Sequence, residues 1–355
     1  MRLNKSAIIA LMMLSATASP ACADVKVVTS IKPVHSLVSA VMQGVGSPGL
    51  LVEGAGSPHN YSLKPSQAQQ LQEADIVFWM GEELETFLEN SIDSIAANAV
   101  SVPLLDSHGL SRLPLREGGA FDSHDEHGHS GHDEHGHDDH KDHGHDEHGH
   151  DEHGHNDHKD HGHDEHAHDE HGHNDHKDHG HGEFDAHIWL DPQNAKALVN
   201  EIAEHLAEID PSQAAAYQAN ASAVMERLDI LTAEIESEVA SVKDRGYVVF
   251  HDAYQYFETR FGVSAIGSIT VSPEVVPGAE RVRELQEKIR KLDAACVFSE
   301  PQFEPKLVAT VIENTDARSA VLDPLGATIP KGPDLYFTLI RNMASSLTGC
   351  LKRAG

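Results

Sequence analysis

The segment from His124 to His181 constrains the fold more than any other part of the chain, because it cannot contribute to a hydrophobic core. It holds 23 of the 29 histidines, set among Asp, Glu and Gly, and its largest apolar residue is Ala167. A segment of this composition buries too little apolar surface to offset the entropy of ordering, so we expect it to be disordered. Folded structure must come from the sequence on either side, with residues 122–183 as one long loop.

The composition of this loop also predicts metal binding. Neutral imidazole is the commonest metal ligand in proteins, and carboxylates add oxygen donors. The segment 139–145, Asp-His-Lys-Asp-His-Gly-His, recurs at 157 and at 175, which indicates a multivalent metal collector. The alternative is a spacer that expanded by repeat slippage. The loop histidines expected to bind metal with low affinity are His127, His129, His135, His137, His143, His145, His148, His150, His153, His155, His161 and His163.

The charge of the chain favours cations as partners. Residues 122–183 carry 21 acidic side chains against three lysines, and so account for −18 of the formal net charge of −31. An acidic protein repels nucleic acid and anionic lipid and attracts cations. We therefore expect no nucleic-acid partner, and the charge permits metal binding without proving it.

Residues 1–23 are typical of a cleaved secretion signal. They combine a positively charged start, an apolar stretch over residues 7–14 and the small-residue site Ala-Cys-Ala at 21–23. The apolar stretch is too short to span a bilayer, and no later segment is long or apolar enough. We expect a mature periplasmic protein that begins near Asp24, with lipid attachment at Cys22 as the alternative.

Two blocks of alternating strand and helix patterns flank the loop, which predicts an α/β fold with parallel sheets covered by helices. We expect an N-terminal lobe over residues 24–209, a linking helix over 210–245 and a C-terminal lobe over 246–355. Ligands of open parallel sheets bind beyond the carboxyl ends of the strands, so a site should lie in the cleft between the lobes. The expected strands are 25–30, 50–52, 75–79, 100–102, 187–190, 247–250, 263–266, 295–298 and 320–322.

One long helix is expected between the two blocks. Asp210 and Pro211 form a good start, with a cap followed by proline at the first helical position. Apolar residues then recur at spacings of three and four from Tyr217 to Val242. A helix over residues 211–243 would be about 50 Å long and could serve as a strut between the lobes. The alternative is an ordinary surface helix of one domain.

Four polar residues stand at strand ends, where a cleft site would form. His59 follows the second strand, His187 enters the strand after the loop, His251 ends the first strand of the second block, and Asp323 ends the last. A single histidine at such a place is more often a structural hydrogen-bonding residue than a ligand. Four such residues, two from each lobe, form a more specific pattern.

The motifs around these residues resemble those of the cluster A-I solute-binding proteins of metal ABC importers. Segment 58–65 reads Pro-His-Asn-Tyr-Ser-Leu-Lys-Pro, and segment 185–192 reads Asp-Ala-His-Ile-Trp-Leu-Asp-Pro. The resemblance covers the whole mature chain. It implies two lobes joined by one rigid helix, and a metal site whose ligands fall on His59, His187, His251 and Asp323.

The third ligand and the loop point to the zinc-specific branch of that family. The manganese and iron branch has a glutamate where this chain has His251. Three imidazoles suit Zn²⁺, and either Asp323 or a water would complete a tetrahedron, with Zn–N distances of about 2.0–2.1 Å. Some zinc-specific members have a glutamate directly before the first histidine. Here Pro58 takes that place, so no carboxylate ligand is expected from this loop.

Two cysteines, Cys296 and Cys350, remain after the signal is removed. In an exported chain they could form a disulfide or stay as buried free thiols. The zinc-specific branch pairs a cysteine of the second lobe with one in the last helix. The resemblance therefore implies a disulfide between Cys296 and Cys350.

The expected function is capture of Zn²⁺ in the periplasm and its delivery to an ABC permease and its ATPase at the inner membrane, by a monomer that is not an enzyme. The alternatives are a manganese or iron member of the same family and a zinc-buffering or storage protein. A zinc hydrolase is disfavoured, because no strand-end residue stands out as a general base and no His-Glu-x-x-His helix occurs.

The other conspicuous residues have ordinary expected roles. Asp185 and Asp252 could orient ligand histidines through hydrogen bonds, although capping or surface roles fit as well. His35 and His205 are expected to be surface or helix residues. Trp79 and Trp189 are expected in the core.

Overall fold

The computed structural model describes residues 25–116, 121, 184–270, 277–292, 294–304 and 306–352. The chain divides into two units, Met1–Ser123 with Gly182–Gly355, and His124–His181. The predicted signal, with Cys22, and the predicted metal-binding histidines of the loop lie outside the described residues. All of the described residues belong to the first unit.

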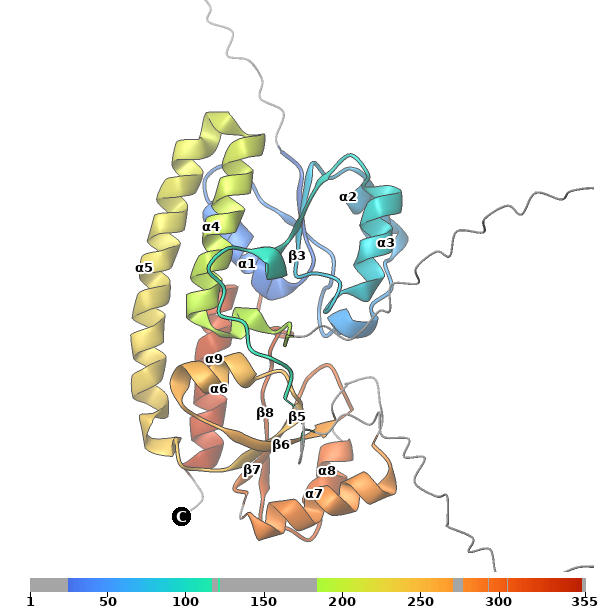
Figure 1. Cartoon of the computed structure of the whole chain (residues 1–355), viewed down its shortest axis with the longest axis vertical. Coiled ribbons are helices and arrows are strands. Elements are labelled where there is room, and N and C mark those ends of the chain that lie inside the picture. Colours follow the sequence, from blue (N-terminus) through green and yellow to red (C-terminus); the bar gives the residue numbers. More distant parts are fainter. Residues whose placement is uncertain are drawn as a thin grey trace, which may run out of the picture. The chain divides into compact units, whose positions relative to one another are not determined.

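Each lobe is built on a four-stranded parallel sheet, as predicted (Figure 1). The strand orders are β2-β1-β3-β4 and β6-β5-β7-β8, so the two sheets share one topology. β3 shows why these strands form, since all four of its residues are apolar and buried, as parallel strands covered on both faces require. The strands are β1 (Val27–Thr29), β2 (Gly49–Leu50), β3 (Ile76–Trp79), β4 (Val100–Pro103), β5 (Tyr247–His251), β6 (Ala265–Thr270), β7 (Cys296–Ser299) and β8 (Arg318–Val321).

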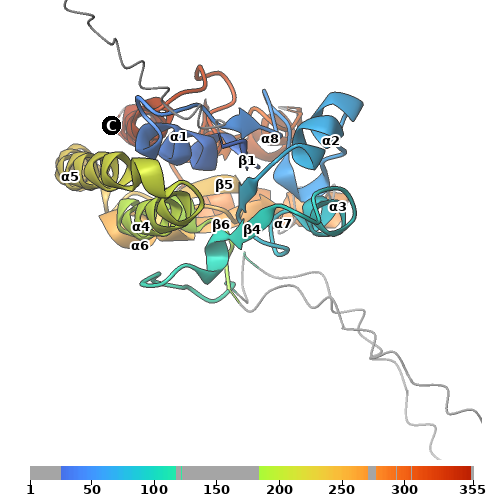
Figure 2. The same ribbon diagram turned by 90° about the horizontal axis from the view of Figure 1, so that it is seen from above.

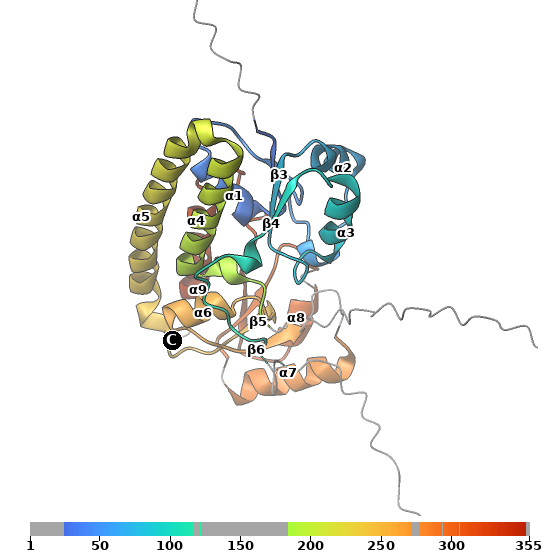
Figure 3. The same cartoon turned by 45° about the horizontal axis from the view of Figure 1, so that its top comes forward.

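Helices cover both faces of each sheet. Figures 1 and 3 show α4, α5 and α9 on one side, while α2 and α3 lie on the other side of the first sheet and α7 and α8 on that of the second. The view in Figure 2 likewise separates α1, α4 and α5 from α2 and α3. The helices are α1 (Lys32–Val41), α2 (Pro65–Gln72), α3 (Thr86–Ile95), α4 (Pro192–Ile209), α5 (Ala214–Val239), α6 (Gln255–Phe261), α7 (Ala279–Lys291), α8 (Lys306–Ile312) and α9 (Leu335–Leu351).

The long helix has the predicted apolar stripe but is not one continuous α-helix. α5 runs from Ala214 to Val239, about 39 Å, and a 3-10 turn adjoins each end, at Pro211–Gln213 and Ala240–Val242. Its buried face contacts helices of both lobes, including α1, α4 and α9. The buried residues of α5 are Tyr217, Ala221, Val224, Leu228, Leu231, Thr232, Ile235 and Val239.

One hydrophobic core continues through both lobes on the side of α5. It joins residues of the first lobe such as Leu198 and Val34 to residues of the second such as Val249 and Leu339. A smaller cluster lies under α2 and α3, and another under α7 and α8. Because close-packed interiors resist shear, this shared core favours small relative motions of the lobes over wide opening.

The prediction of a strand over residues 187–190 is wrong. Ile188–Leu190 forms a 3-10 helix, in which Leu190 N donates to the carbonyl of His187. These residues are apolar because all three are buried, not because they pair in a sheet. Asp191 then caps α4 by accepting a hydrogen bond from Gln193 N at 2.8 Å.

The expected disulfide is present, and the expectations for the two tryptophans and for His35 are met. Cys296 in β7 is bonded to Cys350 in α9, with Cα atoms 6.3 Å apart. Both tryptophans are buried as predicted. His35 lies on a helix, α1, as one of its two expected roles requires, and its side chain is buried. Burial lowers the pKa of His35 to about 4. No helix within the described ranges is both long and apolar enough to cross a membrane.

Candidate metal site

His59 is presented by a short turn between β2 and α2. Pro58–Asn60 forms a 3-10 turn, and the Ser57 hydroxyl accepts a hydrogen bond from His59 N at 3.4 Å. Burial, together with repulsion from the imidazoles of His187 and His251, holds the pKa of His59 well below its usual value. Its imidazole is therefore neutral near pH 7, as a metal ligand must be.

His187 is fixed by the carboxylate of Asp185. Asp185 Oδ1 accepts hydrogen bonds from His187 N at 2.9 Å and from His187 Nδ1 at 2.7 Å. Asp185 is itself held by its backbone, since its N–H donates to Leu113 O and its carbonyl accepts from the Tyr256 hydroxyl at 2.8 Å. A proton on Nδ1 that faces a carboxylate leaves Nε2 of His187 free to bind a metal. The predicted orienting role of Asp185 thus matches the geometry.

His251 is the last residue of β5, and a carboxylate also fixes its ring. Its Nδ1 lies 2.7 Å from Glu300 Oε1, and both side chains are buried. Burial alone would lower the pKa of His251, but the Glu300 carboxylate outweighs burial and raises it.

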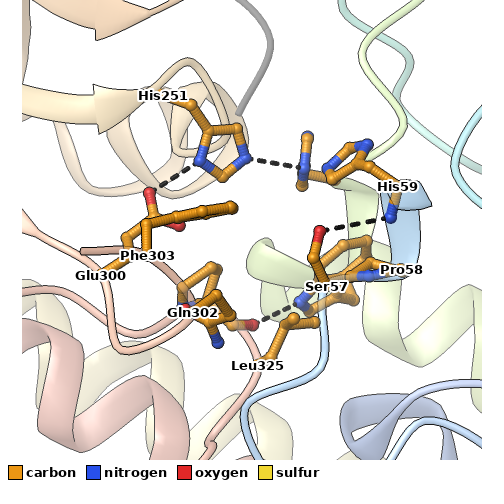
Figure 4. Close-up of a pocket in the computed structure, with 11 residues that line it drawn as sticks. Ser57, Pro58, His59, His251, Glu300, Gln302, Phe303 and Leu325 are labelled. Carbon is orange, nitrogen blue, oxygen red and sulfur yellow. Dashed lines mark hydrogen bonds and ion pairs between the residues drawn. The ribbon is translucent and has the colours of Figure 1, made fainter. Parts of the chain in front are cut away.

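The three imidazoles converge at a distance that suits a metal ion. One nitrogen from each ring lies within 4.8 Å of the others, and Nε2 of His187 is 3.4 Å from Nε2 of His251 (Figure 4). Two ligands at Zn–N distances of 2.0–2.1 Å in a tetrahedron would be roughly 3.3–3.4 Å apart. Since both rings direct Nδ1 to a carboxylate, both Nε2 atoms present lone pairs, and a shared cation would stabilise their approach.

The rest of the cavity is mostly apolar. Its walls come from both lobes. Apolar walls lower the local dielectric constant and strengthen the attraction between the ligands and a cation. The residues that line it are Ser57, Pro58, His59, His187, Trp189, His251, Glu300, Gln302, Phe303, Pro324 and Leu325.

Asp323 lies outside the three-histidine cluster. Its Oδ1 accepts from Leu325 N at 3.1 Å, Gly326 N at 2.9 Å and Gln302 Nε2 at 3.1 Å, and its Oδ2 accepts from Ala327 N at 2.6 Å. These four donors hold the loop after β8. A ligand role for Asp323 stays a prediction, and its present contacts do not support it.

Sequence reasoning missed Glu300, and of the alternatives that it left open for Asp252 the orienting role does not match the structure. Asp252 accepts two hydrogen bonds from Arg116 Nε, at 3.0 and 2.9 Å, and does not hold the His251 ring. Glu300 directly follows β7 at the same edge of the sheet as His251. That position at a strand end was the available signal.

Comparison with known proteins places this chain in a family. The family model described as "Zinc-uptake complex component A periplasmic" matches residues 27–350. The chain belongs to this zinc-uptake family, ZnuA. The "High-affinity zinc uptake system protein ZnuA" of Brucella suis biovar 1 (strain 1330) is 57% identical over 328 residues, covering 92% of this chain and 92% of the relative.

Other members agree with this assignment along nearly the whole chain. The protein of the same name from Paracoccus denitrificans (strain Pd 1222) is 40% identical over 351 residues, covering 98% of this chain and 99% of the relative. A solved structure, "Crystal structure of ZnuA", has a TM-score of 0.68 at 21% identity, and covers 93% of this chain and 100% of that one. At that identity the likeness concerns the fold, which is the same two-lobed α/β fold.

Proposed function

We propose that this chain captures Zn²⁺ in the periplasm and delivers it to an ABC permease and its ATPase. One observation carries the proposal: imidazoles of His59 and His187 from the first lobe meet that of His251 from the second within 4.8 Å. The membership in the zinc-uptake family supports the same function. Two rings held by carboxylates and one by a turn form a largely preorganised site, which favours tight capture from dilute metal.

The donor set favours Zn²⁺ over Mn²⁺. Zn²⁺ binds imidazole nitrogen well in a four-coordinate site, whereas Mn²⁺ prefers carboxylate, carbonyl and water oxygen in octahedral sites. The three converging donors are all nitrogens. The manganese or iron alternative would need further oxygen ligands in a cavity whose walls are mostly apolar.

The His-rich loop would collect zinc or sense it, and would pass ions to the three-histidine site. Described residues on either side of the loop, Pro114 and Phe184, form an antiparallel bridge. The bridge adjoins Asp185, the carboxylate that holds His187. A storage protein would depend on the loop alone, but the cluster of three histidines provides a site independent of it.

The remaining parts of the proposal concern the cellular setting. The family is one of solute-binding transport components, so a membrane permease and its ATPase are the proposed partners. We propose export to the periplasm through cleavage of residues 1–23, a monomeric state and no catalytic activity. The lobes would be those of residues 24–209 and 246–355, linked by residues 210–245.

Calorimetry with and without the loop tests the proposal. Because Pro114 and Phe184, on either side of the loop, are bridged, deletion of residues 124–181 should leave the fold intact. The deletion variant should keep one tight site that prefers Zn²⁺ to Mn²⁺. Loss of a carboxylate that supports a metal ligand weakens metal binding by up to about 100-fold. In the loop-deleted background His251→Ala removes a ligand itself, so it should weaken Zn²⁺ binding by more than that. His205→Ala, on the partly exposed face of α4, is the matched control and should have no effect.

Two results would contradict the proposal. A tight site that prefers Mn²⁺ would refute the metal assignment. Loss of all tight binding on loop deletion would favour storage instead.

A further inference from the structure

A zinc ion can reach the buried histidines of the cavity only when the cavity walls move. Only 7% of His187 and 4% of His251 is exposed, and the walls come from both lobes. The hydrophobic core that the lobes share on the side of α5 resists wide opening. Polar contacts elsewhere on the boundary between the lobes therefore decide how often the cavity opens.

Residues 111–116, here called the strap, cross from the first lobe to the second, as the teal ribbon after β4 shows in Figures 1 and 3. The strap begins on the first lobe, where Ser111 N donates to Asn194 Oδ1 at 2.8 Å and Asn194 Nδ2 donates to Ser111 O at 3.0 Å. Apart from the single bridge at Pro114, its residues belong to no helix or strand. The strap can therefore leave the second lobe without unwinding a helix or a strand.

The far end of the strap makes a charged contact with the second lobe. Arg116 Nε donates to both oxygens of Asp252, at 3.0 and 2.9 Å, and Arg116 Nη1 donates to Glu258 Oε2 at 2.7 Å. Both carboxylates belong to the second lobe, one directly after β5 and the other in α6, and Glu258 is buried. The centre of the Phe121 ring lies 4.1 Å from the guanidinium and covers it. An arginine fork that binds two carboxylates and keeps its charge forms a strong and specific contact.

Two charged contacts elsewhere on the boundary hold helices. Arg260 binds both oxygens of Asp191 at 2.7 Å and so joins α6 to the start of α4. Lys32, the first residue of α1, donates to three backbone carbonyls of the second lobe. Release of either contact requires a helix to move, whereas release of Arg116 requires only the strap to move.

We propose that Arg116 is a latch between the lobes that sets how fast zinc enters and leaves the cavity, and not how tightly zinc binds. The inference rests on the proposed function. The partners of Arg116 differ from Asp185 and Glu300, the carboxylates that hold the rings of His187 and His251. The latch therefore stabilises the closed arrangement equally with and without zinc. It slows entry and exit by the same factor, which cancels from the dissociation constant while the closed state remains the major one.

Stopped-flow kinetics of the full chain test the latch. Zinc below one equivalent fills the tightest site, and an excess of chelator then removes it. The fluorescence of Trp189, whose ring centroid lies 5.2 Å from that of His187, reports both steps. A hydrogen bond to a charged group is worth a factor of about 10–100 in an equilibrium constant, so Arg116→Gln should raise the association and the dissociation rate constants at least about tenfold. The zinc affinity should change less than about threefold.

The same strap provides the matched control. Arg112→Gln changes a residue whose guanidinium contacts Leu105 O and Asp106 of the first lobe, and its rate constants should equal those of the wild type. Arg116→Lys keeps the charge but loses the fork. Its rate constants should lie between those of the wild type and those of Arg116→Gln.

Unchanged rate constants in Arg116→Gln would overturn the inference. Faster dissociation with unchanged association would also overturn it, because the loss of affinity would show that Arg116 supports the site itself. Equal acceleration in Arg112→Gln would remove the assignment to the contact between the lobes. If urea unfolding shows that Arg116→Gln does not fold, wild-type rate constants in Arg116→Lys would overturn the latch instead. A wild-type protein without tight zinc binding at the histidines would overturn the proposed function as well.

Discussion

Glu85 makes the stability of this protein depend on pH in a direction opposite to that of most carboxylates. It stands just before α3, fully buried, and its Oε2 accepts hydrogen bonds from Met80 N at 2.7 Å and Gly81 N at 3.4 Å. Burial outweighs these hydrogen bonds and raises the pKa of Glu85 from 4.5 to about 7. The folded protein therefore keeps a proton here that the unfolded chain has released.

The size of the effect is set by linkage. The pKa of Glu85 is about 7 in the folded protein and 4.5 in the unfolded chain. The stabilisation linked to this proton is therefore complete below pH 4.5 and is lost as pH rises through about 7. The full shift corresponds to about 3 kcal/mol, of which roughly 2.5 kcal/mol falls between pH 5 and pH 8. Glu85→Gln keeps a carbonyl oxygen for the same two N–H groups and cannot ionise.

Urea denaturation of metal-free protein at pH 5 and pH 8 measures this effect. The difference in unfolding free energy between Glu85→Gln and the wild type should shift by roughly 2.5 kcal/mol in favour of the variant from pH 5 to pH 8. The exposed neighbour Glu82, changed to Gln, is the control and should show a shift near zero. A constant difference between Glu85→Gln and the wild type at the two pH values would refute the reasoning.

Three further predictions concern the site and its supports. Asp185→Ala should lower zinc affinity about 10–100-fold. Asp185→Asn should lower it by less, because the amide oxygen can still accept a hydrogen bond from His187 Nδ1. Equal losses of affinity for the two variants in calorimetry would argue against this orienting role of Asp185. Cys296 and Cys350 are 54 residues apart, and replacing both with Ser should lower the free energy of unfolding, measured in urea, by about 4 kcal/mol. Zinc affinity should change less than about threefold. Arg116→Met removes the ion-pair partner of Asp252 and of the buried Glu258, and should lower the free energy of unfolding by about 3 kcal/mol. A loss below about 1 kcal/mol would show that water replaces the ion pairs.

The fold could be predicted because its strands and helices carry strong local signals. The apolar runs of β3 and β5 and the stripe on α5 each require burial, and the alternation of strands and helices leaves few topologies besides parallel sheets. Residues 188–190 carry the same apolar signal for another reason. They pack as a 3-10 turn against Pro324, whose carbonyl accepts from Trp189 Nε1, and this long-range contact leaves no local trace in the sequence.

The site could be predicted in part. The three histidines lie in distinctive sequence motifs, and the structure brings them together. The roles of Asp323 and Glu300 depend on which way each side chain turns beside the cavity. Four donors hold the Asp323 carboxylate and one ring holds Glu300, and such competition among nearby partners is decided by tertiary geometry rather than by residue type.

Anomalous diffraction at the zinc edge, from crystals of the zinc-loaded protein, tests the central claim most directly. The account predicts one strong peak about 2.0–2.1 Å from an imidazole nitrogen of each of His59, His187 and His251. A peak elsewhere, with these three rings bound to no common ion, would contradict it.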